Sequence, residues 1–180
     1  GRKAAEESAD RIIELLDANT KMLFLTAGMG GGTGTGAAPV IAEIAREKGI
    51  LTVGVVTNPF STEGGYRKQY AEDGLAELKK YVDTLLIINN DKLIEVYGDL
   101  TFTQAFGKAN EVLNTATKGI AEVISQHLLV NIDLNDARKV LENSGTAVMG
   151  QAIAEGENRA IEAVMGALDS PLLNDNDITG

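Results

Sequence analysis

A glycine-rich stretch from Gly28 to Gly36 lies between a short apolar run and a segment with helical spacing. Six of its nine residues are glycine, and because glycine has no Cβ, backbone amides in such a loop can approach an anion closely. The helix that follows would contribute its positive N-terminal end. Thr33 and Thr35 add hydroxyl donors that could reach a phosphate or a bound magnesium ion. The stretch therefore predicts a phosphate-binding loop.

The loop differs from two common phosphate-binding motifs. It has no Gly-Lys-Ser/Thr ending, which a P-loop requires, and its glycine spacing does not give the G-x-G-x-x-G fingerprint of dinucleotide-binding folds. Proline is tolerated in the first turn of a helix, so Pro39 favours a helix that begins at or just after Gly36. A tight glycine-rich turn without a ligand remains the alternative interpretation.

Apolar runs of strand length alternate with helical segments in the first half of the chain. Continuous apolar runs indicate strands buried on both faces, and such strands separated by helices indicate a parallel sheet. The predicted elements are a helix over 3–17, a strand over 22–27, a helix over 36–48, a strand over 51–56, a helix over 66–81 and a strand over 84–88. The predicted fold class is α/β, with a mostly parallel sheet and flanking helices.

The pattern changes after residue 100. Apolar residues at spacings of three and four, starting at Phe106, predict one helix of about 24 residues, twice the average length of about 12. A helix of this length is suited to connect two modules of the protein. The alternative interpretation is an ordinary helix of the hydrophobic core. Over residues 128–180 the pattern predicts a polar loop, a helix over 136–143, a weak strand over 146–151 and a helix over 157–168. We interpret residues 1–127 as one unit and 128–180 as the beginning of a second domain.

The composition argues against several classes of protein. Sixteen basic and 26 acidic residues give a net charge of −10, which repels nucleic acid. The absence of cysteine excludes disulfides, thiol catalysis and cysteine-bound zinc, and the single histidine, His127, cannot form a multi-histidine metal site. We interpret His127 as structural, because a cation is favourable at the end of a helix. No run is long and apolar enough to predict a membrane span, and 44% hydrophobic residues indicate a soluble globular chain.

Several motifs resemble the tubulin/FtsZ family of GTPases. They are Gly30–Gly36 within the run Thr26–Phe60, Asn90-Asp91-Lys92-Leu93, the long helix from Phe106, Asn131-x-Asp133-x-x-Asp136, Gly156–Ala160 and Ser170–Leu173. The resemblance extends over nearly the whole chain. It implies a tubulin/FtsZ-type GTPase domain over residues 1–127, followed over 128–180 by a catalytic loop and the start of the C-terminal domain.

The same resemblance implies a guanine nucleotide, GTP or GDP, with Mg²⁺ or another cation held through its phosphates. In the glycine-rich loop, the residues implied to bind the nucleotide are Gly30, Gly31, Gly32, Thr33, Gly34 and Thr35. Of these, Gly32, Thr33 and Gly34 would hold the phosphates. Thr57 would lie near the ribose or a phosphate, Glu63 and Arg67 would contact ribose and phosphate, Asn90 and Asn110 would read the guanine edge, and Phe106 would pack against the base. From the residues alone, a Glu and an Arg four apart also suit a surface ion pair, and a lone Asn also suits a cap.

Asn131, Asp133 and Asp136 are the residues that the resemblance implies to be catalytic. In the family this loop projects into the nucleotide site of the next subunit, where its carboxylates position the attacking water and help to hold the cation. The implied partner is therefore a second copy, joined head-to-tail in filaments. From the residues alone, the same segment suits an acidic N-cap of the helix predicted over 136–143.

The resemblance also implies a setting, a cytoplasmic ring at the mid-cell division site, with regulators and membrane tethers as further partners. The family's first strand and first phosphate loop would precede residue 1, so we expect weak nucleotide affinity and little turnover from this chain alone. Departures from the family pattern are Ser61 and Thr62 where relatives often carry an aromatic residue, Asn110 in place of Asp and Asn135 in place of Ala. Two alternatives stay open: a filament subunit that binds nucleotide without hydrolysing it, and an NAD-type dinucleotide-binding domain.

Overall fold

Four parallel strands form one sheet in the computed structural model, which describes residues 1–125, 133–150 and 152–168. The strands are β1 (Met22–Gly28), β2 (Leu51–Asn58), β3 (Thr84–Asn89) and β4 (Gly145–Ala147), and they lie side by side in that order. The register pairs Gly28 with Thr57, and Asn58 with Asn89. The carboxyl ends of the first three strands, and the loops that follow them, therefore meet at one edge of the sheet.

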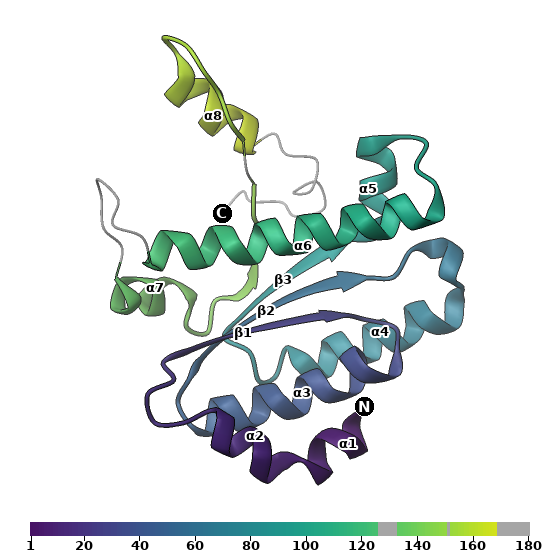
Figure 1. Ribbon diagram of the computed structural model, residues 1–180, viewed down its shortest axis with the longest axis vertical. Coiled ribbons are helices and arrows are strands. Elements are labelled where there is room, and N and C mark those ends of the chain that lie inside the picture. The colour runs from purple at the N-terminus through teal and green to yellow at the C-terminus, as the bar shows by residue number, and fades with distance from the viewer. Residues whose placement is uncertain (126–132, 151, 169–180) are drawn as a thin grey trace.

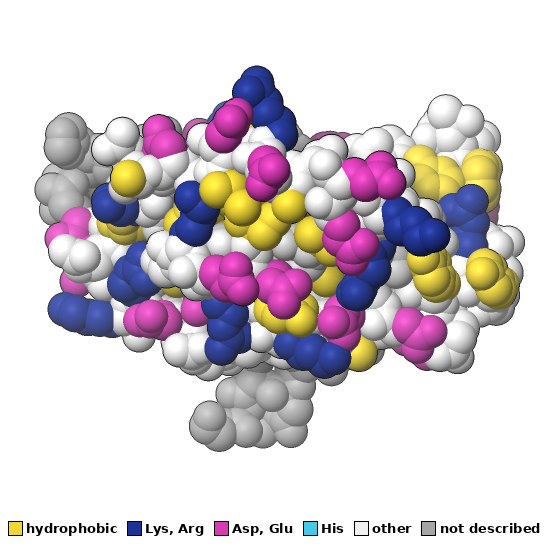
Figure 2. All heavy atoms as spheres, turned by 90° about the horizontal axis from the view of Figure 1, so that it is seen from below, with side chains coloured by type: hydrophobic (Ala, Val, Ile, Leu, Met, Phe, Trp, Pro, Cys, Tyr) yellow, Lys and Arg dark blue, Asp and Glu magenta, His cyan; other side chains and the backbone are white. Residues whose placement is uncertain are grey.

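Helices cover both faces of this sheet (Figure 1). They are α1 (Arg2–Glu7), α2 (Ala9–Leu15), α3 (Gly32–Glu47), α4 (Gly65–Leu78), α5 (Asn90–Tyr97), α6 (Phe102–Ser125), α7 (Leu134–Leu141) and α8 (Arg159–Leu168), with a short 3₁₀ turn at Ser61–Glu63. On one face α3 and α4 pack against the strands, and α1 and α2 pack outside α3. On the other face α6 crosses the strands. Figure 2 shows the surface of α1–α4 from below, where acidic and basic side chains are interspersed.

The alternation of side chains along the strands builds the two halves of the core. Leu25, Val56 and Leu85 face α3 and α4, whereas Val53, Val55 and Leu86 face α6 and its Ala116. Strands buried on both faces are typical of a parallel sheet between helical layers. The α/β fold class predicted from the sequence is confirmed.

The helix after the glycine-rich loop begins earlier than the sequence predicts. We expected it at or just after Gly36, but α3 begins at Gly32, so Thr33, Gly34 and Thr35 lie in its first turn. The chain completes its reversal by Gly31, because Gly30 adopts a φ of +94° that glycine tolerates. Pro39 consequently lies in the helix interior, where it removes one intrahelical hydrogen bond and is fully buried.

Three other elements differ from their predictions. The helix predicted over 3–17 is divided at Ser8, which allows Ala5 of α1 and Leu16 after α2 to pack against α3 together. Helix α5 was not predicted, although the Asn89 side chain caps it by accepting a hydrogen bond from Asp91 N. The strand predicted over 146–151 is reduced to β4, which pairs with β3 and so extends the main sheet.

The long helix predicted from Phe106 is α6, which starts one turn earlier at Phe102 and has 24 residues. The predicted domain boundary between residues 127 and 128 lies outside the described residues, as does His127. In the part of the chain that the structure describes, no helix combines the length and apolar character needed to cross a membrane.

Candidate functional site

The loop between β1 and α3 exposes bare backbone at the start of a 16-residue helix. Gly31 is the N-cap residue and makes no side-chain capping hydrogen bond. A Cβ added to Gly31 or Gly32 would meet no heavy atom within 4 Å, so open space lies beside both residues. The first amides of a helix have no intrahelical acceptor, and together with the helix dipole they bind anions. This geometry suits a phosphate group at the start of α3.

Other residues in the loop hold its shape. A Cβ on Gly34 would lie 2.3 Å from the carbonyl oxygen of Gly28, so the backbone approach there requires glycine. Gly30 N donates a hydrogen bond of 2.9 Å to Oγ1 of the buried Thr35. Thr35 therefore closes the loop from within, whereas Thr33 is exposed at the start of the helix.

The segment after β2 brings Thr57, Glu63 and Arg67 to the same edge. Thr57 O accepts a hydrogen bond of 2.9 Å from Met29 N, which ties this segment to the loop after β1. Glu63 Oε2 lies 3.2 Å from Arg67 Nη1, and the side chain of Glu63 is only 10% exposed. The ion pair expected from the four-residue spacing is therefore present. It places one carboxylate and one guanidinium beside the glycine-rich loop.

The segment after β3 contributes Asn90, whose side chain is 3% exposed. Among the described side chains, the buried oxygens Asn90 Oδ1 and Asn58 Oδ1 have no hydrogen-bond partner. Buried polar atoms are almost always paired, so an orphan at the edge of a candidate site points to an absent partner. An amide offers a donor and an acceptor together, which suits the edge of a purine base.

Helix α6 adds Phe106 and Asn110. The Phe106 ring packs edge-to-face against Phe60 at 5.1 Å and against Phe102 at 4.8 Å, and Phe106 keeps part of its surface exposed. Asn110 lies one turn further along α6 and is exposed. Both residues belong to the first half of α6 (Phe102–Ser125), and the N-terminal end of this helix lies near α5 (Figure 1). An aromatic ring and an amide from one helix thus lie near the carboxyl edge of the sheet.

The residues predicted to be catalytic do not join this edge. Asp133 is the N-cap of α7, with Oδ1 accepting from Asp136 N at 2.9 Å, and Asp136 Oδ2 accepts from Asp133 N at 3.4 Å. The capping interpretation of this segment is therefore confirmed. Both carboxylates remain exposed. Asn131 lies outside the described residues.

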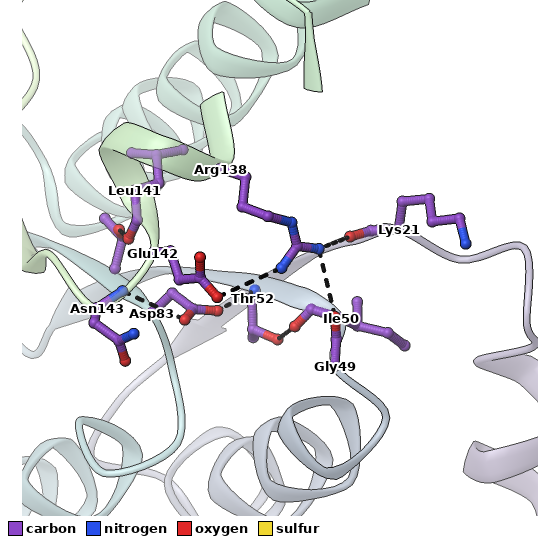
Figure 3. A network of polar contacts seen from close by, with 10 residues as sticks. Lys21, Gly49, Ile50, Thr52, Asp83, Arg138, Leu141, Glu142 and Asn143 are labelled. Carbon is purple, nitrogen blue, oxygen red and sulfur yellow. Dashed lines mark hydrogen bonds and ion pairs between the residues drawn. The ribbon is translucent and has the colours of Figure 1, made fainter. Parts of the chain in front are cut away.

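Helix α7 is fastened to the amino ends of the strands, at the opposite edge of the sheet (Figure 3). Arg138 donates to the carbonyl oxygens of Lys21 and Gly49, which come just before β1 and β2, each at 3.4 Å. Asn143 N donates to Asp83 Oδ1, and Asp83 Oδ2 accepts from Thr52 N. The structure thus separates the predicted site residues into two groups, one at each edge.

A cavity lies away from the glycine-rich loop. It has a volume of about 470 Å³ between β3, α5, α6 and residues 149–166. Lys108 at its wall donates to Glu111 at 2.8 Å, and this hydrogen bond raises the pKa of Lys108. The cavity is mainly apolar, and we assign the candidate site to the strand ends, where orphaned amides and bare backbone converge. No group of three or more His, Cys, Asp or Glu side chains suited to a metal occurs among the described residues.

Sequence reasoning missed three residues of this edge. Phe60 is 2% exposed beneath Phe106, and Asp91 accepts hydrogen bonds from both Ser61 N and Ser61 Oγ. The sequence held only a weak signal for Asp91, namely that an acidic residue is favourable in the first turn of a helix. Its partner Ser61 is 30 residues away, and no local pattern reports such a contact.

Comparisons with known proteins agree with this geometry. The model of the Tubulin/FtsZ family, GTPase domain, matches residues 1–98. The cell division protein FtsZ of Coxiella burnetii is 54% identical over 181 residues, and that of Buchnera aphidicola subsp. Acyrthosiphon pisum is 53% identical; each match covers 100% of this chain and 47% of the relative. The chain thus spans about half the length of these curated relatives.

Solved structures show the same relationship. An empty FtsZ dimer from M. jannaschii superposes with a TM-score of 0.91 at 46% identity, over 96% of this chain and 50% of that one. CetZ from Methanosaeta thermophila superposes with a TM-score of 0.78 at 22% identity, over 93% of this chain and 48% of that one, which shows the fold alone. With a family model matching residues 1–98 of 180, and 54% identity to a curated FtsZ, the chain belongs to the tubulin/FtsZ family.

Proposed function

We propose that the protein binds GTP at the carboxyl edge of its sheet and hydrolyses it in a site completed by a second copy. The observation that carries this proposal is the separation of two groups of residues along the strands. β2 alone has eight residues, and at about 3.3 Å a residue the two edges lie roughly 23 Å apart. One copy cannot bring both groups to one nucleotide, whereas copies stacked head-to-tail can.

The nucleotide half of the proposed site follows from the edge already described. The amides of Gly31, Gly32 and Thr33 at the start of α3 would hold the phosphates, with Gly30, Gly34 and Thr35 shaping the loop. Thr57, Glu63 and Arg67 would contact ribose and phosphate. Asn90 and Asn110 would read the guanine edge, and Phe106 would pack against the base.

The acidic half would orient the attacking water. Asp133 and Asp136 are exposed, and their capping box holds them in a fixed mutual arrangement at the start of α7. Phosphoryl transfer depends mainly on positioning and on electrostatic stabilisation, so a pre-set carboxylate that accepts a proton or hydrogen bond from water is the contribution needed. We assign Asn131 to the same group because it completes the Asn-x-Asp-x-x-Asp pattern.

A divalent cation fits the phosphate half of this site. Exposed Thr33 offers a hydroxyl beside the open space at Gly32, and oxygen ligands of this kind suit Mg²⁺ together with phosphate oxygens. The ion would neutralise charge that develops on the phosphates. We also propose a wider setting of filaments at a cytoplasmic division site, with regulators and membrane tethers as further partners; relatives that are named cell division proteins support the division role.

A mixing experiment on the full-length gene product tests the composite site. Gly31→Glu places a carboxylate in open space at the phosphate position, and Asp133→Asn removes the charge while keeping a good N-cap. We expect each variant alone to lack GTP turnover. Random pairing in an equal mixture joins an intact loop to an intact Asp133 at one contact in four, so about a quarter of the wild-type rate should return. A mixture that stays inactive contradicts a site shared between copies.

The two alternatives give different results in the same assay. A wild-type protein that binds GDP but shows no turnover at any protein concentration would be a filament subunit without hydrolysis. NAD that displaces GDP with similar affinity would indicate a dinucleotide-binding domain. Turnover per subunit that rises with protein concentration supports the proposal.

A further inference from the structure

Asp91 connects two of the segments that carry nucleoside-contacting residues of the proposed site, the loop after β2 and the start of α5. It is the second residue of α5, directly after Asn90. Its Oδ1 accepts from Ser61 N at 2.9 Å, and its Oδ2 accepts from Ser61 Oγ. Both oxygens of one carboxylate are therefore used on one residue of the loop that follows β2.

The loop held by Asp91 makes packing and hydrogen-bond contacts on both sides of Ser61. Phe60, next to Ser61, is 2% exposed and packs against Phe106. Phe60 N donates to Glu63 Oε1 at 2.9 Å, and Glu63 N donates to Phe60 O at 2.9 Å. A displacement of Ser61 would therefore move Phe60 and Glu63 with it.

On the side of α5, hydrogen bonding also fixes the position of Asp91. Asp91 N donates to Asn89 Oδ1 at 3.1 Å, and the buried Asn90 lies between these two residues. Charge-assisted hydrogen bonds accepted by a carboxylate are stronger than bonds between neutral groups. A contact through both carboxylate oxygens also restricts the orientation of the two groups. The contact thus restrains the distance between Asn90 on one segment and Glu63 on the other.

We propose that Asp91 is a positioning residue that sets the separation between the ribose-side carboxylate of Glu63 and the base-side amide of Asn90. This inference rests on the proposed function. Asp91 itself touches neither nucleotide nor water in this assignment. Its loss should therefore impair recognition of the nucleoside and leave the phosphate contacts at Gly31 and Gly32 unchanged.

Calorimetric titration of the full-length gene product with GDP, and separately with inorganic pyrophosphate, tests this division. For Asp91→Ala we expect GDP binding about tenfold weaker and pyrophosphate binding changed less than about twofold, because only the nucleoside part of the site loosens. Ser61→Ala keeps the bond from the backbone N–H and should give about a threefold loss for GDP. In turnover, Asp91→Ala should raise KM for GTP with little change in kcat.

Asp73→Ala is the matched control. Asp73 is exposed and accepts a hydrogen bond from Gln69 of the same helix, α4, so its loss should change neither titration. The double variant Ser61→Ala with Asp91→Ala should bind GDP no more weakly than Asp91→Ala alone, because the two side chains act through one contact.

Each result has a defined meaning. GDP binding by Asp91→Ala that equals wild type, or equal losses for GDP and pyrophosphate, overturns the positioning role and leaves the proposed function standing. If Asp91→Ala does not fold, Ser61→Ala decides: a selective loss of GDP affinity supports the role, and unchanged GDP affinity overturns it. A wild-type protein that binds pyrophosphate but not GDP overturns the proposed guanine site itself, and this inference with it.

Discussion

Arg138 of α7 donates a hydrogen bond of 3.4 Å to the carbonyl oxygen of Lys21, the residue directly before β1. This contact joins residues 117 positions apart and fastens the acidic turn of α7 to the amino edge of the sheet. The same guanidinium lies 3.7 Å from the carboxylate of Glu142, the residue directly after α7. The position of the proposed catalytic carboxylates therefore depends on a residue that carries no chemistry itself.

Arg138→Ala should lower GTP turnover several-fold while GDP affinity remains at the wild-type value. The contact is long and partly exposed, so the loss of unfolding free energy should stay below about 1 kcal/mol. Steady-state turnover together with GDP titration checks this outcome. Val140→Ala is the control, because Val140 lies in the same helix and its side chain is exposed. A parallel fall in GDP affinity would show that the edges are not independent.

Asp133→Ala should differ from Asp133→Asn in stability but not in turnover. Alanine removes the N-cap of α7 and should cost about 1 kcal/mol, whereas asparagine retains an oxygen that accepts from Asp136 N. Both remove the carboxylate and should abolish hydrolysis. Urea unfolding and a phosphate-release assay measure the two effects. Full activity of Asp133→Asn would refute the catalytic assignment of this carboxylate.

Substitution by alanine should lower the free energy of unfolding at one glycine of the loop and leave it nearly unchanged at another. Gly34→Ala places a Cβ 2.3 Å from Gly28 O, and the required backbone shift should cost about 1–3 kcal/mol. Gly31→Ala enters open space at an ordinary negative φ and should change stability by less than about 0.5 kcal/mol. Thermal unfolding of the two variants provides the comparison. Equal destabilisation would mean that the close approach at Gly34 does not hold.

Asn110→Ala should leave the fold intact and reduce discrimination between purines. Its side chain is exposed on α6, so stability should change by less than about 0.5 kcal/mol. The ratio of GDP to ADP affinity should fall about tenfold, because a polar base edge loses one partner. Competition titrations with both nucleotides give this ratio, with Glu111→Ala as a neighbouring control. An unchanged ratio would remove Asn110 from the guanine site.

Local signals in the sequence were sufficient to predict the first three strands, the glycine-rich loop and two of the local side-chain contacts. Continuous apolar runs indicated β1, β2 and β3, because strands buried on both faces leave that pattern. Glycine density indicated the loop after β1, because only bare backbone needs so many glycines. The spacing of Glu63 and Arg67 indicated their ion pair, and the acidic turn before α7 indicated its cap.

Contacts between distant segments were beyond such signals. The start of α3 at Gly32 was missed for a local reason, since the hydrogen bond from Gly30 to Thr35 and the close approach of Gly34 to Gly28 are backbone geometry that periodicity does not report. The pairing of β4 with β3 joins segments about 60 residues apart, and three residues carry too weak a pattern for a strand to be delimited. The two halves of the proposed site have clear motifs, yet their places at opposite edges follow only from the parallel topology and from Arg138.

The sequence by itself determined the α/β class, the glycine-rich loop after β1 and the family, because period, glycine content and motif spacing are properties of short stretches of chain. Only the tertiary structure decided that Asp91 holds the loop of Glu63, and that Asp133 lies at the far edge of the sheet from Gly31. The physical reason is that such arrangements result from packing and hydrogen bonds between residues far apart in sequence, which no local periodicity encodes.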